Sequence, residues 1–125
     1  MKSILVIEDN VLLADFIAEV LQEEGYKVQV VANGQEGLSR LREVEPDLVI
    51  TDSMMPKLSG EEVCQVIKAH PKYHEIPVVL MSSRDEAFVN VKCKYAAFLP
   101  KPFDLSSLLG LVVRLIGIRN NGITV

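Results

Sequence analysis

Residues 48–52 read Leu-Val-Ile-Thr-Asp, a short apolar run that ends in an acid. The apolar positions are continuous rather than alternating, which is typical of a strand that is covered on both faces. We therefore predict a buried strand from Leu48 to Thr51, with Asp52 directly after it. Comparable runs, each also predicted to form a strand, span residues 3–7, 27–31, 78–81 and 96–99.

Helical patterns separate these runs. Residues 11–24 carry polar side chains on one side, and Gly25 follows where helices commonly end in a left-handed residue. A second helix is predicted over about residues 35–44, and a third after Ser59, which stands in capping-box spacing with Glu62. The apolar residues expected to face the core are Leu12, Leu13, Phe16, Ile17, Val20 and Leu21 in the first helix, and Val63, Val66 and Ile67 in the third.

The alternation of strands and helices predicts an α/β fold. A last helix, predicted to begin after the N-cap candidate Asp104, completes a series of parallel strand–helix–strand units with right-handed crossovers. Such units form a doubly wound five-stranded parallel sheet with helices on both faces, in either of two common strand orders. In both orders ligands bind beyond the carboxyl ends of the strands, where the strand order reverses.

Length and composition restrict the class of protein. The chain has 125 residues, the size of one domain, and no linker or repeat divides residues 1–125. Its 13 basic and 17 acidic residues give a net charge of −4, which argues against binding of a nucleic-acid backbone. Two cysteines are too few for a disulfide framework, so we expect both to be reduced in a soluble, cytoplasmic protein. No signal peptide or membrane-spanning run is evident, and we expect no contact with a membrane.

Acids cluster at the predicted ends of two strands. Glu8 and Asp9 follow the first strand, and Asp52 follows the third. The fold would bring these carboxylates together, where their repulsion is relieved by a hard divalent cation such as Mg²⁺. For Glu8 and Asp9 taken alone, solvated caps of a loop are the simpler interpretation.

Two further strand ends carry a hydroxyl and an ammonium group. Ser82 follows the fourth strand, and Lys101 follows the fifth between two prolines. A lone serine or lysine at such a place is usually a turn or surface residue. An ammonium group at this edge would either offset the acidic cluster or hold a phosphoryl oxygen. Acids, hydroxyl and lysine on four different strand ends indicate a functional site rather than a coincidence.

In these residues the chain resembles the receiver domain of two-component response regulators. The resemblance covers Ile4 to about Ile118 and rests on four features: the acidic pair Glu8-Asp9, the segment 52–56 followed by Gly60, the hydroxyl of Ser82, and Lys101-Pro102-Phe103. It implies a flavodoxin-like sheet with the strand order 2-1-3-4-5. It also implies a phosphoacceptor function in a two-component system.

The resemblance assigns a role to each residue of the site. Asp52 would take a phosphoryl group from a phosphohistidine, and Lys101 would pair with Asp52 before transfer and with the phosphoryl group afterwards. Glu8, Asp9 and Asp52 would hold Mg²⁺ together with the main-chain carbonyl of Met54. The receiver would slowly lose its own phosphoryl group, with no separate substrate turnover.

Two more residues would transmit the signal. The hydroxyl of Ser82 would bond a phosphoryl oxygen, and the ring of Phe98 would turn inward as a switch that alters a protein-interaction surface. An ordinary core position is an equally good interpretation of Phe98. Between these residues the chain departs from the family pattern, because the connection is short and Lys94-Tyr95 replaces the usual Gly-Ala. The fourth helix, around residues 85–92, is therefore predicted to be short or irregular.

The resemblance also implies partners. The phosphodonor would be a histidine kinase or a histidine phosphotransfer protein, docked in part on Val11, Leu12 and Ala14. The output would be a downstream protein or a fused output domain, with no direct nucleic-acid binding by this segment. The chain is either a stand-alone receiver or part of a longer regulator.

Two alternatives remain open at this stage. Phosphatases of the haloacid dehalogenase type also use an aspartate after a strand, but they need a second acid two residues later, where this chain has Met54. A pseudo-receiver would keep the fold without using phosphate.

Overall fold

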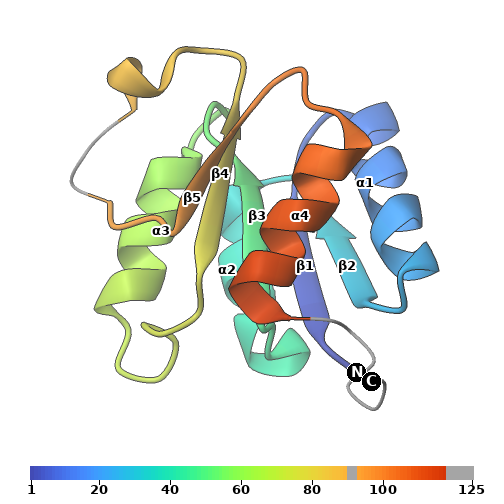
Figure 1. Ribbon diagram of the computed structural model, residues 1–125. Coiled ribbons are helices and arrows are strands. Elements are labelled where there is room, and N and C mark those ends of the chain that lie inside the picture. Colours follow the sequence, from blue (N-terminus) through green and yellow to red (C-terminus); the bar gives the residue numbers. More distant parts are fainter. Residues whose placement is uncertain (90–92, 118–125) are drawn as a thin grey trace.

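A computed structural model describes residues 1–89 and 93–117. Five parallel strands form one sheet in the order β2-β1-β3-β4-β5 (Figure 1). The doubly wound order 2-1-3-4-5 is thus confirmed. The strands span Ser3–Ile7 (β1), Lys27–Val31 (β2), Leu48–Asp52 (β3), Val78–Ser82 (β4) and Ala97–Pro100 (β5).

The sheet register places the functional strand ends side by side. In β1 and β3 Ile7 is paired with Thr51, so the residues that follow them leave the sheet at the same level. The bounds predicted for β1 and β2 are confirmed, whereas the last three strands each end one residue later than predicted. Asp52 is therefore the final residue of β3 itself and not part of a loop. β2 lies on one side of β1 and β3 lies on the other, so the strand order reverses at β1. The carboxyl ends of β1 and β3 therefore form the switch point of the sheet.

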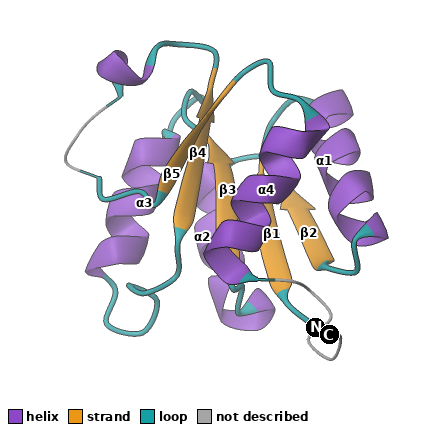
Figure 2. Ribbon diagram, viewed as in Figure 1, coloured by secondary structure: helices purple, strands orange, loops and turns teal. Residues whose placement is uncertain are grey.

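Helices cover both faces of the sheet (Figure 2). Buried residues of α1 and α4 pack on one face, and those of α2 and α3 pack on the other. The two cores explain the continuous apolar runs, because every residue of β3 and β4 is buried. The helices span Val11–Glu23 (α1), Gly34–Val44 (α2), Gly60–Ala69 (α3) and Leu105–Ile116 (α4).

The local signals at the helix ends act as predicted. Ser59 and Glu62 form a reciprocal capping box at the start of α3, and Asp104 caps α4 by accepting a hydrogen bond from the Ser107 amide. Gly25 has a φ of 93°, the left-handed conformation in which glycine lacks a steric penalty. These signals need only neighbours in the chain, which is why sequence alone finds them.

The apolar faces predicted for α1 and α3 are wrong at three positions. Leu12 is 82% exposed, Phe16 is 45% exposed and Val66 is 46% exposed. The buried residues of α1 are Ala14, Ile17 and Leu21, which lie on one narrow stripe. Leu13 and Val20 are partly buried and pack against the same core, as predicted. The apolar pattern is wider than the arc of helix that reaches the sheet, so its flanks remain in solvent.

The described part of the connection from β4 to β5 contains one short helical turn. This 3₁₀ turn, η1, spans Glu86–Phe88, so the prediction of a short or irregular fourth helix is confirmed for the described part. Residues 90–92 of that segment, like Ile118 and the tail to residue 125, lie outside the described residues. No helix in the described ranges is long and apolar enough to cross a membrane.

A disulfide joins Cys64 of α3 to Cys93, which lies before β5. The expectation that both cysteines are reduced is therefore wrong. The two residues are 29 positions apart in the chain, but α3 and the β4–β5 connection cover the same face of the sheet, which brings their Cα atoms to 5.9 Å.

Candidate functional site

Three carboxylates meet at the carboxyl ends of β1 and β3. One oxygen each from Glu8, Asp9 and Asp52 lies within 4.8 Å of the others. Glu8 is 2% exposed and Asp52 is 7% exposed, whereas Asp9 is open to solvent. The acidic cluster predicted from the strand ends is thus present, with two of its members buried.

Lys101 approaches this cluster from the end of β5. Its Nζ donates to Glu8 Oε1 at 2.9 Å and lies 3.3 Å from Asp52 Oδ1. Its backbone amide donates to the carbonyl of Ser82, which ties the loop to the end of β4. The ammonium group therefore bridges two carboxylates, and the shorter contact is to Glu8 rather than to the expected Asp52.

Burial and charge act in opposite directions on these groups. Burial raises the pKa of Glu8, although hydrogen bonds from the Asn10 amide and Lys101 favour the charged form. Burial likewise raises the pKa of Asp52 against the lowering effect of Lys101. Burial alone would lower the pKa of Lys101, but its bonds to Glu8 and Asp52 outweigh this and raise it. The single positive charge of Lys101 therefore does not balance the negative charges of the three carboxylates in the cluster.

The donor set fits a hard divalent cation. All three side chains offer carboxylate oxygens, the ligands that Mg²⁺ prefers. Both oxygens of Glu8 already accept hydrogen bonds, one from Lys101 and one from the Asn10 amide. Asp52 also accepts hydrogen bonds from Lys101 and from the Met54 amide, which leaves the exposed Asp9 as the acid with the most free lone pairs for direct coordination. For Met54, the recorded contact is a hydrogen bond from its amide to Asp52, and the carbonyl predicted as a ligand stays a prediction.

Ser82 and Phe98 lie on the neighbouring strands. Ser82 is 1% exposed, and its Oγ accepts a hydrogen bond of 3.0 Å from the amide of Arg84. Phe98 of β5 is half-buried against the core on the α2–α3 face and lines a surface groove with Ser83 and Glu86. The predicted roles of both residues in signal transmission stay predictions.

A pocket of about 440 Å³ opens beside the site. One wall comes from the β3–α3 loop and the start of α3, including Met54 and Glu61, and the other from the β4–β5 connection. Arg84 spans it, with Nη1 3.9 Å from the Met54 sulfur and its guanidinium 5.4 Å from the centre of the Phe88 ring. Any molecule approaching Asp52 from this side meets these side chains.

Gly60 allows α3 to begin close to the end of β3. Its amide donates to the Ser53 carbonyl at 2.9 Å, which folds the β3–α3 loop back onto the end of β3. A Cβ atom at this position would collide with the carbonyl oxygen of Asp52. The glycine thus lets α3 begin directly against the backbone of Asp52. The disulfide and the hydrogen bond from the Asn10 amide to Glu8 were not predicted from the sequence, and only the second joins residues that are close in the chain.

Comparisons with known proteins agree with this geometry. Residues 4–113 match the family model of the response regulator receiver domain. The DNA-binding response regulator MtrA of Mycolicibacterium paratuberculosis is 30% identical over 89% of this chain. The match covers 49% of MtrA, so the chain spans about half the length of this curated relative.

Solved structures share the whole fold. The receiver domain of a signal transduction histidine kinase from Syntrophus aciditrophicus is 31% identical, with a TM-score of 0.88 over 100% of this chain and 98% of that one. The receiver domain of a sensor histidine kinase from Pseudomonas aeruginosa, described with a magnesium ion coordinated in its active site cleft, has a TM-score of 0.85. It is 24% identical, with 93% of this chain and 98% of that chain covered, and at this identity the likeness shows the fold alone.

Proposed function

The chain belongs to the response regulator receiver domain family of two-component signalling, and from that membership we propose that Asp52 is its phosphoacceptor. The observation that carries the proposal is the position of the Asp52 carboxylate. It lies at the end of β3, 3.3 Å from Lys101 Nζ and within the cluster formed with Glu8 and Asp9. A nucleophilic carboxylate beside a fixed positive charge is the arrangement that phosphoryl transfer needs, because catalysis there is mostly positioning and charge compensation.

The donor would be a phosphohistidine of a histidine kinase or a histidine phosphotransfer protein. An oxygen of Asp52 attacks phosphorus, the P–N bond breaks, and the imidazole keeps the electron pair and takes up a proton. The product is an acyl phosphate on Asp52. After transfer, the ammonium group of Lys101 would pair with a phosphoryl oxygen instead of the carboxylate oxygen of Asp52.

We assign Mg²⁺ to the acidic cluster. Asp9 and Asp52 would hold it directly, Glu8 would support them, and the carbonyl of Met54 would be the further protein ligand. The bound ion would neutralise charge on the transferred group. Support comes from the three oxygen donors within 4.8 Å of one another, two of which belong to buried side chains. The excess of acids over Lys101 leaves the site short of positive charge, which such an ion would supply.

Phosphorylation would be transmitted through Ser82 and Phe98. The Ser82 oxygen accepts from the Arg84 amide, so its own proton is available to a phosphoryl oxygen. A shift of Ser82 toward Asp52 would carry Arg84 with it and change the groove that Phe98 lines. Such a change is a two-state equilibrium biased by the new hydrogen bond.

The kinase would dock on the start of α1. Val11 is 69% exposed and Leu12 is 82% exposed, and both follow Asp9 by only a few residues. Ala14, also predicted to take part in docking, is buried, so that part of the prediction is wrong. The output would be a downstream protein or a fused output domain, since the similar proteins include a DNA-binding regulator and receiver domains of kinases. The chain itself would turn over no separate substrate.

The decisive experiment uses a small phosphodonor. We expect incubation with acetyl phosphate and Mg²⁺ to increase the intact mass by one phosphoryl group, and a chelator to abolish the gain. Asp52→Asn should remove the gain, whereas the matched control Asp15→Asn, an exposed acid on α1, should retain it. A gain that persists in Asp52→Asn would show that another residue is the acceptor.

A further inference from the structure

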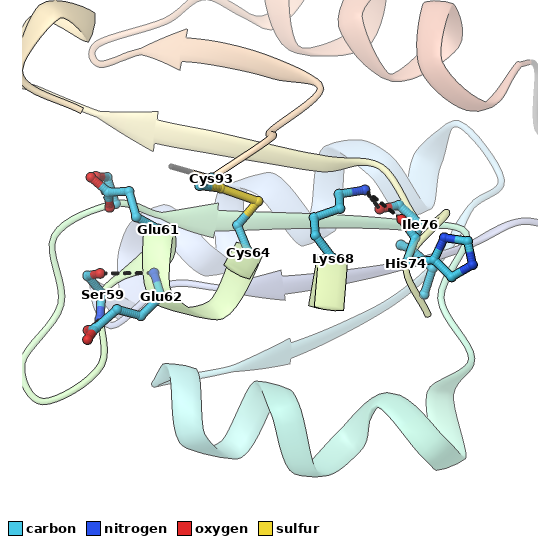
Figure 3. Close-up of a disulfide and its surroundings, with 9 residues drawn as sticks. Ser59, Glu61, Glu62, Cys64, Lys68, His74, Ile76 and Cys93 are labelled. Carbon is cyan, nitrogen blue, oxygen red and sulfur yellow. Dashed lines mark hydrogen bonds between the residues drawn. A yellow bond between two sulfur atoms is a disulfide. The ribbon is translucent and has the colours of Figure 1, made fainter. Parts of the chain in front are cut away.

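The β4–β5 connection is held to α3 by the disulfide between Cys64 and Cys93. Figure 3 shows Cys64 on α3 facing Cys93, with Glu61 one turn earlier on the same helix. Cys64 is fully buried and Cys93 is 3% exposed, so the bond lies inside the core of this face. The disulfide is therefore part of the packing between two segments that are remote in the chain.

Among the described residues of this connection (83–89 and 93–96), most of the other hydrogen bonds are local. The exceptions are the Ala96 amide, which donates to the Val78 carbonyl of β4, and Arg84, which contacts the Met54 sulfur. The amides of Phe88 and Val89 donate to Asp85 and Glu86 in the same turn, and the Tyr95 hydroxyl donates to the Glu86 carboxylate at 2.6 Å. Hydrogen bonds of this kind shape the segment but do not fix it to the sheet. Val89 and Cys93 are its buried residues against α3, and the covalent bond is at the second of them.

The same two segments form opposite walls of the pocket beside Asp52. Glu61, three residues before Cys64, lies on the α3 side, and Phe88 and Val89 lie on the other side, four to five residues before Cys93. A bond that joins the two segments therefore limits how far the walls can separate. This pocket gives water a route to an acyl phosphate on Asp52 from the side of Ser53 and Ser82.

We propose that Cys64 and Cys93 form a reversible thiol–disulfide site through which a dithiol reductant loosens the β4–β5 connection and shortens the lifetime of phosphorylated Asp52. The effect on lifetime rests on the proposed phosphoacceptor function. The disulfide site itself does not. Signal duration in this protein would then depend on redox state as well as on the kinase.

The exchange chemistry balances with a dithiol as the reductant. A thiolate of the dithiol attacks one sulfur, the Cys64–Cys93 bond breaks, and the displaced cysteine leaves as a thiolate. The second thiol of the reductant then attacks the mixed disulfide and releases the other cysteine. Two electrons and two protons pass from the dithiol to the protein, and the reductant ends as its own disulfide. A disulfide oxidant reverses these steps.

Because both sulfurs are buried, a dithiol and a monothiol should differ in how completely they reduce the disulfide. Attack requires the connection to open locally, so native exchange should be slow. A monothiol that has formed a mixed disulfide can be expelled by the freed cysteine when the segment closes. A dithiol resolves the mixed disulfide intramolecularly and completes the reduction.

The test begins with the oxidised protein and counts alkylated thiols by intact mass after treatment with dithiothreitol or with 2-mercaptoethanol. We expect two thiols after dithiothreitol and fewer after the same thiol concentration of 2-mercaptoethanol. Amide exchange in residues 83–89 should be faster in the reduced protein. The acetyl-phosphate-labelled reduced protein should lose its phosphoryl group at least about twice as fast, because an opened segment admits water more often.

Cys93→Ala provides the matched variant, because it leaves the α3 core residue Cys64 in place. Its amide exchange and phosphoryl lifetime should equal those of the reduced protein and should not respond to dithiothreitol. Equal lifetimes in the oxidised and reduced wild type would overturn the proposed regulation, and two free thiols after treatment with a disulfide oxidant would overturn the site itself. If neither redox state is phosphorylated, the phosphoacceptor assignment fails. Thiol counts and amide exchange still decide whether the disulfide between Cys64 and Cys93 forms reversibly and restrains residues 83–89.

Discussion

Replacing Gly60 by alanine should damage both the stability and the chemistry of this domain. The added Cβ would lie 2.9 Å from the carbonyl carbon of Asp52 and from Cα of Ser53, and closer still to the Asp52 carbonyl oxygen. These are backbone atoms, so no side chain can move aside. Either α3 moves away from the sheet or the end of β3 shifts.

The magnitude follows from two opposing effects. Alanine in place of glycine stabilises an unobstructed helix by roughly 0.5–1 kcal/mol. Overpacking in a filled site destabilises by about 1–3 kcal/mol, and loss of the hydrogen bond from the Gly60 amide to the Ser53 carbonyl adds about 1 kcal/mol. The atoms that the added Cβ would meet belong to the backbone of Asp52 and Ser53, so the destabilising effects should dominate. We expect a net loss of about 1–3 kcal/mol in the free energy of unfolding.

Gly110→Ala is the matched control. Gly110 lies in α4 with nothing within 4 Å of the added Cβ, so the same substitution should stabilise the domain by roughly 0.5–1 kcal/mol. Urea unfolding of both variants measures these differences. Phosphorylation by acetyl phosphate should slow by about tenfold in Gly60→Ala, because a displaced Asp52 is no longer aligned with Lys101, and should be unchanged in Gly110→Ala. A Gly60→Ala protein as stable and as reactive as Gly110→Ala would show that α3 does not need a glycine where it meets the backbone of Asp52.

Three further predictions concern charge and the disulfide. Reversing the charge of Asp15 on α1 should slow transfer from the cognate kinase without changing labelling by acetyl phosphate, and equal kinase rates would place the docking face elsewhere. Reducing the disulfide, which closes a loop of 29 residues, should lower the free energy of unfolding by about 3–4 kcal/mol, measured by urea unfolding with and without dithiothreitol. In a chelator, Asp52→Asn should stabilise the domain, because burial raises the pKa of Asp52 and its charge opposes folding. The gain in stability is present above the raised pKa of Asp52, where the wild-type carboxylate is charged. It shrinks as the pH falls toward the ordinary carboxyl pKa of about 3.9. An equal gain at acid and neutral pH would show that the buried charge of Asp52 is not its cause.

Local patterns were enough to predict most elements and the members of the acidic cluster. Continuous apolar runs show that Leu48 and its neighbours are covered on both faces, and the pattern does not depend on which helices cover them. The capping box of Ser59 and the left-handed Gly25 depend only on adjacent residues. Carboxyl ends of parallel strands share one edge, so Glu8 and Asp52 could be placed together once the strands were found.

Contacts between remote segments were decided by the tertiary structure. Cys64 and Cys93 pair because α3 and the β4–β5 connection pack on one face, and nothing near either cysteine in the chain signals this. Lys101 lies closer to Glu8 than to Asp52, and Leu12 is exposed. The position of each loop and helix on the sheet determines these distances and exposures. A sequence pattern records the preference of a residue for burial or conformation. Which other residue it meets depends on how whole elements pack, and that packing depends on interactions summed over the entire core.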